Sequence, residues 1–310
     1  MRKNILITGG SGFIGSNLVD FLISKGHNIF VIDDLSTGLK ENENSLATYY
    51  HYDLVNCIED SKYIEDILIN HNIDFVYHLA ASADIFLSIN NPEKVYKINV
   101  LASIAFVNVC IKCNIKKFLF ASTSAVYGEP QYLPVDEQHP TDPMSPYGLT
   151  KLGFEQYLSY LKLHSDTSFI IYRFPNVYGY RQRPDLEGGV VAIFQDAIEK
   201  NNDIKIFGDG RQTRDWVDVV DILSALDKGL GFEKKFDIFS LGSNTKTSLT
   251  MLLDYFKDIT GYSKSPIYLD ERDGDIKHMV MRYDYAKKEL DWEPSISLRD
   301  GIRKLVDGVK

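Results

Sequence analysis

Tyr147 and Lys151 form the pair of side chains in this sequence that is best placed to carry out proton transfer. Ser145 is a favourable N-cap and Pro146 suits the first helical position, so we expect a helix that carries Tyr147 in its first turn. Lys151 then lies one turn later on the same face. Lowering a tyrosine pKa from about 10 to about 7 requires roughly 4 kcal/mol, which an ammonium group and a helix N-terminus help to supply. The pair therefore predicts a tyrosine that acts as general base and, in reverse, as general acid.

The context of this pair matters, because a chain with 19 tyrosines contains Y-x-x-x-K by chance. Gly9, Gly12 and Gly15 have the spacing G-x-x-G-x-x-G and lie between an expected strand and an expected helix. Glycines let the backbone turn tightly and approach a pyrophosphate, and the helix N-terminus supplies amides and partial positive charge. The segment predicts a dinucleotide site.

Asp33 ends the second expected strand, where a carboxylate meets the adenosine ribose and repels a 2′-phosphate. Asp34 follows it, and no arginine occurs from Val31 to Leu39, so we expect NAD and not NADP. Asp53 either receives the adenine amino group or forms a turn. The expected cofactor site comprises Gly9, Gly12, Phe13, Ile14, Gly15, Asp33, Asp34, Ser36, Thr37, Gly38, Asp53, Leu54, Leu79, Ala80, Ala81, Tyr147 and Lys151.

Hydroxyl groups close the fifth expected strand in the segment 122–128, S-T-S-A-V-Y-G. With the glycine loop, Asp33, Y-x-x-x-K and the segments 173–179 and 207–216, this strand end resembles the extended short-chain dehydrogenase/reductase family that acts on nucleotide sugars. The resemblance covers nearly all 310 residues. It implies that Thr123 is the catalytic hydroxyl, with Ser124 as a less favoured neighbour.

Ser124 and Ala125 separate the branches of this family. The sugar 4,6-dehydratases that it resembles carry Asp-Glu at this point, because elimination of water needs an acid and a base, and the decarboxylases keep the glutamate. Without a carboxyl group here, reversible hydride transfer remains. The resemblance implies epimerisation at C4 of a UDP-hexose, UDP-glucose or UDP-galactose, through a 4-keto intermediate. The alternatives are epimerisation of UDP-glucuronate or UDP-N-acetylglucosamine, net dehydrogenation or reduction, and a dinucleotide sensor without activity.

The resemblance also implies a nucleotide-sugar site. Asn176 matches a residue that holds phosphate or sugar, and Phe207 matches one that stacks on uracil. Arg214 and Arg272 match two arginines on the pyrophosphate, for which guanidinium forks are suited. Asp275 matches a carboxylate on the uridine ribose. Surface ion pairs for the arginines and a turn for Asp275 remain the alternatives.

Two further features bear on the sugar. The segment 181–189, with Arg181, Arg183, Gly188 and Gly189, is interpreted as a mobile loop beside the substrate. It resembles short archaeal and bacterial epimerases. Met279 matches the position that gates bulky 2-substituents, and a flexible methionine there favours some activity on UDP-N-acetylglucosamine.

The elements that must position these residues alternate between strand and helix. We expect strands at 5–8, 29–33, 49–52, 75–79, 118–122 and 169–173, and helices near 13–25, 61–70, 93–113 and 146–163. This alternation predicts an α/β fold, a doubly wound parallel sheet of the Rossmann type over residues 1–174. Shorter elements over 175–310 predict a smaller substrate-binding α/β cap, with some segments returning to the sheet. These are helices near 190–199, 218–228, 247–258 and 298–308 and strands near 204–207 and 236–240.

Composition narrows the setting. Apolar residues make up 44% and charged residues 25%, which is typical of a globular protein, and the net charge of −9 argues against a nucleic-acid partner. No long apolar run or signal-like start is evident, so we expect a cytoplasmic protein with no membrane partner. Three cysteines do not make a disulfide framework. Cys110 and Cys113 are interpreted as helix packing residues, with a redox or metal role as the alternative, and no metal site is expected.

Two expected helices are apolar around most of their circumference. The segment 93–113 carries Val95, Ile98, Leu101 and Ile104, and the segment 147–163 carries Leu149, Leu152 and Tyr160. A sheet covers one side of a helix, so either neighbouring helices or a twofold partner cover the rest. The resembling family dimerises through these two helices, and we expect a homodimer.

Overall fold

The computed structural model describes residues 2–186, 189–271 and 276–309. Its centre is a sheet of seven parallel strands in the order β11-β6-β5-β4-β1-β2-β3. The strands are β1 (Asn4–Thr8), β2 (Asn28–Asp33), β3 (Thr48–His51), β4 (Phe75–His78), β5 (Lys117–Thr123), β6 (Ser168–Phe174) and β11 (Phe236–Ser240). The doubly wound α/β fold predicted from the sequence is confirmed.

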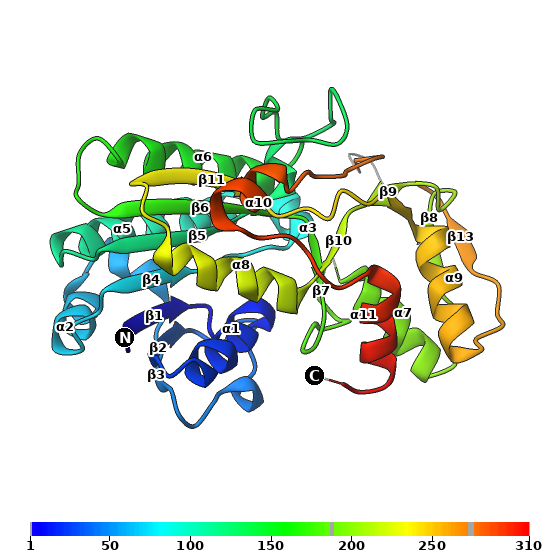
Figure 1. The fold of residues 1–310 in the computed structure, drawn as a ribbon, viewed down its shortest axis with the longest axis horizontal. Coiled ribbons are helices and arrows are strands. Elements are labelled where there is room, and N and C mark those ends of the chain that lie inside the picture. The colour runs from blue at the N-terminus through cyan, green and yellow to red at the C-terminus, as the bar shows by residue number, and fades with distance from the viewer. Residues whose placement is uncertain (1, 187–188, 272–275, 310) are drawn as a thin grey trace.

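Helices cover both faces of this sheet. One face carries α1 (Phe13–Ser24), α8 (Val219–Gly231) and α10 (Asp284–Leu290), and the other carries α2 (Lys62–Asn70), α5 (Ser103–Lys112) and α6 (Pro146–Leu161). Figure 1 shows α1 and α8 on one side of the sheet and α6 on the other. Each face encloses its own apolar core, so every central strand is buried on both sides.

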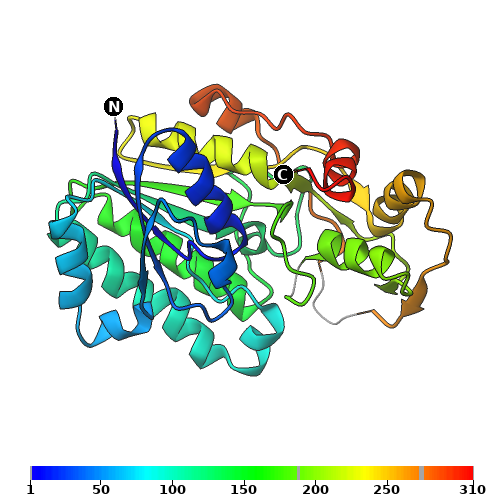
Figure 2. The same cartoon turned by 90° about the horizontal axis from the view of Figure 1, so that it is seen from below.

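The smaller lobe lies beyond the carboxyl ends of the strands. Figure 1 and Figure 2 both place α7, α9 and α11 together at the end of the molecule opposite α2. A separate core there joins Phe194, Phe256 and Ile302 from these three helices. Its elements are β7 (Asn176–Tyr178), α7 (Val190–Glu199), β8 (Lys205–Phe207), β9 (Thr213–Arg214), β10 (Trp216–Asp218), β12 (Thr247–Ser248), α9 (Leu249–Thr260), β13 (Ile267–Leu269) and α11 (Leu298–Val306).

The chain crosses between the two parts more than once. After β7 and the small lobe, α8 and β11 return to the central sheet, and β11 pairs in parallel with β6. Buried Asp221 in α8 fastens the later chain by accepting hydrogen bonds from the amides of Ser295 and Ile296, each at 3.0 Å. The residues after 174 therefore contribute to both the sheet and the lobe.

The predicted helix over 93–113 is continuous but not regular. It consists of α4 (Pro92–Tyr96), a π-helical turn η3 (Lys97–Ala102) and α5. By length and composition alone, Pro92–Lys112 could cross a membrane, and half of its most apolar window is buried against the rest of the protein. Core helices have the same character.

Some short elements were not predicted from the sequence. They are α3 (Ile85–Asn90), α10, β13, the two-residue strands β9 and β12, β7 and β10, and the 3₁₀ turns η1 (Lys40–Asn42), η2 (Leu54–Ile58) and η4 (Ser124–Val126). Such segments hold too few residues for a periodic pattern, and their pairing partners are distant in the sequence.

The packing of α8 on the sheet predicts a sharp steric test. A Cβ at Gly229 would lie 1.7 Å from the hydroxyl oxygen of Tyr172. We expect Gly229→Ala to lower the free energy of unfolding by about 1–3 kcal/mol, because side chain and helix must move apart. Tyr172→Phe removes the clashing atom, so the double variant should recover most of the loss. Urea denaturation of all four proteins measures this coupling, and additive losses would show that the hydroxyl is not the obstacle.

Candidate active site

The glycine loop joins β1 to α1. A Cβ at Gly15 would lie 2.0 Å from the carbonyl oxygen of Gly9, and one at Gly9 would lie 2.8 Å from the amide nitrogen of Ala80. Gly12 is different, because a Cβ there has only the Gly9 carbonyl oxygen nearby, at 3.4 Å. Gly12 is the N-cap of α1, no side chain caps this helix, and its first turn carries no acidic residue. The helix N-terminus therefore presents backbone amides and partial positive charge beside open space, which suits a pyrophosphate.

Asp33 ends β2 beside this loop and is 7% exposed. Its carboxylate accepts hydrogen bonds from the amides of Ser11 at 2.9 Å and Leu35 at 2.8 Å. Burial raises the Asp33 pKa, and these two amides act against that rise. Each oxygen keeps a further acceptor site, so the carboxylate is able to bind ribose hydroxyls.

The other expected cofactor residues line the same edge of the sheet. Asp34 accepts hydrogen bonds from the amide and hydroxyl of Ser36, and a Cβ at Gly38 would lie 2.9 Å from Asp33 Oδ1. Asp53 is exposed, and its carboxylate accepts a bond from the amide of Val55 at the start of η2, as the turn interpretation expects. Phe13, Ile14, Leu54, Leu79, Ala80 and Ala81 are half-buried.

The expected catalytic residues come from β5 and α6. Ser145 caps α6 by accepting a bond from the amide of Gly148 at 3.1 Å, which confirms the predicted helix start. Lys151 is 4% exposed and donates from Nζ to the carbonyl oxygen of Ala121 at 2.8 Å. Thr123, the last residue of β5, is a hydrogen-bond partner of Tyr147. The structure thus brings Thr123, Tyr147 and Lys151 together.

Burial shifts both titrating groups of this set. It raises the pKa of Tyr147 to about 12, with the Thr123 hydrogen bond acting in the opposite direction. It lowers the pKa of Lys151 to about 7, against the attraction of Glu155. The surroundings therefore oppose charge on both groups, and a further positive charge near the phenol is needed for Tyr147 to act as a base near neutral pH.

Asn99 in η3 is a site residue that the sequence analysis did not identify. It is 3% exposed; its side chain accepts from the amide of Ser82 at 2.8 Å and donates to the hydroxyl of Thr150 at 3.1 Å. It thereby joins the segment after β4 to the helix that carries Lys151. A lone asparagine inside an apolar helix was the available signal, and π-helical turns occur frequently at functional sites.

The residues expected to bind the nucleotide sugar lie on the small-lobe side. Asn176 begins β7, where its amide donates to the carbonyl oxygen of Asp215 at 3.0 Å, and Arg214 lies in the neighbouring β9. Buried Asp215 holds this region together, because its carboxylate accepts bonds from the amides of Ser243 at 3.0 Å and Met281 at 2.9 Å.

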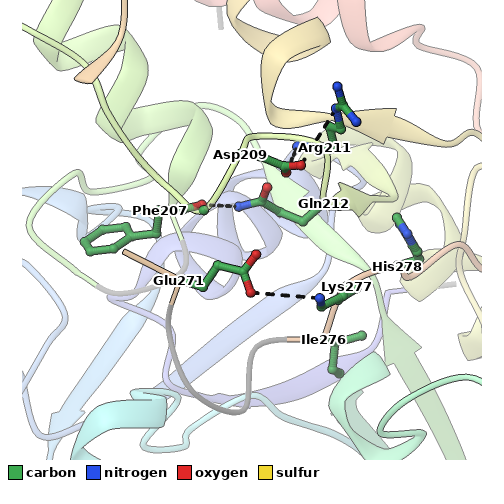
Figure 3. A pocket seen from close by; sticks show the side chains of 9 residues that line it. Phe207, Asp209, Arg211, Gln212, Glu271, Ile276, Lys277 and His278 are labelled. Atoms are coloured by element: carbon green, nitrogen blue, oxygen red, sulfur yellow. Dashed lines mark hydrogen bonds and ion pairs between the residues drawn. The ribbon is translucent and has the colours of Figure 1, made fainter. Parts of the chain in front are cut away.

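A cavity of about 270 Å³ adjoins Phe207 at the end of β8. Figure 3 shows the side chain of Gln212 bonded to the carbonyl oxygen of Phe207 at 2.6 Å, and Glu271 facing Lys277 at 3.9 Å. Gln212, Lys277 and His278 line the cavity and were not identified from the sequence. The predicted ligands Arg272 and Asp275 lie outside the described residues.

The segment 179–185 faces the cofactor side, whereas the sequence analysis placed it beside the substrate. Arg181 Nη1 contacts Asp20 Oδ2 on α1 at 2.8 Å, and Arg183 Nη1 donates to the carbonyl oxygen of Thr37 at 2.9 Å. Arg181 has a φ of 70°, which is rare for a residue with a side chain. The segment therefore bridges α1 and the loop after β2. Gly188 lies outside the described residues.

Met279 is 3% exposed and packs with Val126, Tyr127, Val135 and Met281. Val126 and Tyr127 belong to the same strand end as Thr123. Cys110 is buried in the core of the α5 face, and Cys113 packs against that core. Among the described residues, no three His, Cys, Asp or Glu side chains are grouped to hold a metal ion.

The glycine geometry separates folding from cofactor binding. We expect Gly15→Ala to lower the free energy of unfolding of the cofactor-free protein by about 1–3 kcal/mol, because the methyl group meets backbone. Gly12→Ala should change it by less than about 0.5 kcal/mol, yet weaken NAD binding, because its methyl group occupies the space over the helix N-terminus. Urea denaturation and calorimetry measure the two effects. Wild-type NAD affinity in Gly12→Ala would exclude this helix terminus as the pyrophosphate site.

Comparison with known proteins agrees with this site. A model of the NAD dependent epimerase/dehydratase family matches residues 5–242. The UDP-glucose 4-epimerase of Mycolicibacterium smegmatis is 32% identical, covering 97% of each chain. A Thermotoga maritima UDP-glucose 4-epimerase structure with UDP-glucose has a TM-score of 0.94 and 38% identity, over 98% of this chain and 97% of that one.

A UDP-N-acetylglucosamine 4-epimerase from Methanobrevibacter ruminantium M1, in complex with UDP-N-acetylmuramic acid, is also similar. Its TM-score is 0.90 and its identity 31%, over 99% of both chains. The matched residues include the glycine loop, Asp33, Thr123, Tyr147 and Lys151. This chain belongs to the NAD dependent epimerase/dehydratase family.

Proposed function

We propose that this protein is an NAD-dependent nucleotide-sugar epimerase that interconverts UDP-glucose and UDP-galactose at C4. The observation that carries the proposal is the grouping of Thr123, Tyr147 and Lys151 beside the glycine loop, with Ser124 and Ala125 where the branches that eliminate water have carboxylates. Relatives named UDP-glucose 4-epimerase support the choice of reaction.

The residues present fit NAD. The bare N-terminus of α1 over Gly12 suits the pyrophosphate, and the Asp33 carboxylate suits the two ribose hydroxyls. Buried negative charge at Asp33 disfavours the 2′-phosphate of NADP. When bound, NAD supplies a hydride acceptor and a positively charged ring.

Within this site, Tyr147 takes the proton from the sugar 4-hydroxyl and returns it when the carbonyl is reduced. Thr123, its hydrogen-bond partner, orients the sugar oxygen toward the phenol. The Lys151 ammonium stabilises the phenolate, and the cofactor's positive charge supplies the rest of the shift that burial opposes. After oxidation, the 4-keto sugar must turn so that hydride returns to its other face.

The segment 179–185 supports a retained cofactor, as an epimerase needs. Arg181 and Arg183 attach this segment to α1 and to the loop that follows Asp33. These contacts span the two sides of the expected adenosine site, so they must break before the dinucleotide leaves. A net dehydrogenase releases its cofactor in every turnover, which this arrangement disfavours.

The first functional prediction concerns Tyr147. We expect purified protein to interconvert UDP-glucose and UDP-galactose with no NAD added, and Tyr147→Phe to lower kcat by about 10²- to 10⁴-fold while NAD stays bound. Tyr63→Phe, an exposed tyrosine on α2, is the matched control and should leave kcat unchanged. Turnover that consumes added NAD stoichiometrically would identify a dehydrogenase, and near-normal kcat in Tyr147→Phe would remove this residue from the mechanism.

Met279 generates a prediction on the range of sugars. It packs against Val126 and Tyr127 near Thr123, and methionine adapts to irregular space. We expect measurable activity on UDP-N-acetylglucosamine, and we expect Met279→Tyr to lower that activity about tenfold relative to UDP-glucose. Thermal denaturation controls for misfolding of this variant. No epimerisation of the N-acetylated sugar by wild type, alongside good UDP-glucose activity, would reject the idea.

We also propose that the protein forms a homodimer through α4, η3 and α5 together with α6. Leu101 is 43% exposed and Leu149 is 57% exposed, on neighbouring helices of the same face of the sheet. Tyr96 and Tyr160 are also exposed on these helices. A twofold partner that presents the same two helices would cover this apolar face as a four-helix bundle.

The dimer is tested by charge. Leu101→Glu combined with Leu149→Glu should yield a monomer at micromolar concentration, because two carboxylates per chain would be buried at the interface. Leu46→Glu is the control, since Leu46 is 76% exposed and lies on the opposite edge of the sheet near β3. Light scattering that shows a wild-type monomer, or a dimer that survives the double substitution, would refute this interface.

A further inference from the structure

Three charged side chains lie buried next to one another beneath the site. Lys151 is 4% exposed, Glu155 is 3% exposed and Arg173 is 4% exposed. The proposed reaction uses Lys151 and leaves the other two without a role. Burying charge is costly unless it is paired, so this group requires an explanation.

One carboxylate joins the three elements of this group. Ser122 on β5 and Arg173 on β6 are register partners in the sheet, on the face that α6 covers. From α6, Glu155 accepts hydrogen bonds from the Ser122 hydroxyl and from Arg173, whose Nε and Nη2 lie at 3.1 Å and 2.7 Å. Thr123 follows Ser122, so the carboxylate fastens the strand end to the helix of Tyr147 and Lys151.

The same carboxylate also faces Lys151, which is one turn earlier on α6 and buried like Glu155. The remaining neighbours of the ammonium group offer it little negative charge. On β5, the Ala121 carbonyl and the Phe120 ring contact it, on β4 His78 is kept neutral by burial, which lowers its pKa to about 3, and on α6 Tyr147 is a neutral phenol. Arg173 on β6 is positive.

We propose that Glu155 is a positioning residue for the reaction, whose carboxylate, shared between Arg173 and Lys151, keeps the Lys151 ammonium charged beneath Tyr147. Arginine does not lose its proton in proteins. Without the carboxylate, therefore, only Lys151 is able to relieve the repulsion between the two buried cations, and it does so by deprotonating. The attraction of Glu155 is the influence that opposes burial at Lys151.

Two substitutions with opposite expected effects test this inference, which rests on the proposed function. Glu155→Gln keeps the shape of the side chain and removes its charge, so Lys151 should lose its proton at least about one pH unit lower, a tenfold change in proton affinity. Arg173→Gln leaves the carboxylate to Lys151 alone, so Lys151 should lose its proton at higher pH. Ser122→Ala is the matched control, because it removes the hydroxyl tie and leaves every charge in place.

The Lys151 titration is read directly by NMR of the holoenzyme labelled with ¹³C at lysine Cε, with the resonance assigned by Lys151→Arg. The alkaline limb of the kcat–pH profile should move in the same direction as each titration, and KM should stay near its wild-type value. A merely structural role would lower kcat and thermal stability without moving that limb.

Unchanged Lys151 titration in either charge variant overturns the proposal, and so does a titration that moves while the kcat limb stays in place. Should Glu155→Gln fail to fold, the upward shift in Arg173→Gln carries the test by itself. If wild type epimerises no UDP-hexose, the proposed function fails, and the titration of the unliganded sugar site still decides whether Glu155 controls the charge of Lys151.

Discussion

The parallel alignment of the seven central strands is the constraint on which the site depends. Because all strands run in one direction, their carboxyl ends lie at one edge of the sheet, and the side chains just beyond those ends meet there. The glycine loop follows β1, Asp33 ends β2, Ala80 follows β4 and Thr123 ends β5. Residues far apart in the sequence thus come together without any direct interaction between most of them. The small lobe stands over the same edge and adds Asn176, Arg214 and Phe207 from short strands.

Buried polar groups hold these parts in register. Asp215 ties β7 to the segments near Ser243 and Met281, Asp221 ties α8 to the residues before α11, and Asn99 ties the segment after β4 to α6. Leaving a buried polar group unpaired costs about 1–3 kcal/mol, and breaking a buried ion pair costs about 3–5 kcal/mol. Such contacts fix one arrangement of the lobes because alternatives would leave several of these groups unsatisfied together.

The same economy explains why charge at the site is easily shifted. Burial raises the Tyr147 pKa to about 12 and lowers the Lys151 pKa to about 7, so the protein holds both groups near their neutral forms. The proton of the phenol is released only when positive charge gathers around it. Glu155 and Arg173 bear on this balance from within the core, where the attraction between charges is strongest.

Local patterns in the sequence predicted the long elements well, since β1 to β6 and α1, α2 and α6 have strong apolar runs or caps that act over a few residues. Ser145 as the cap of α6 and the glycine spacing before α1 are of this kind. The two-residue strands, α3 and the π-helical turn around Asn99 were missed, because tertiary partners stabilise them. The segment 179–185 was placed on the substrate side, yet its two arginines contact α1 and Thr37, which no local pattern records.

By itself, the sequence determined which residue types are available for chemistry and the order in which strands and helices carry them. The glycines, Asp33, Thr123, Tyr147 and Lys151 were identifiable because each belongs to a short motif whose spacing has a local physical reason. Only the tertiary structure decided that Glu155, Arg173 and Ser122 share one buried contact from three elements, and that Gln212, Lys277 and His278 line the cavity beside Phe207. Burial and pairing depend on what lies across the sheet, so they arise only when the chain has folded.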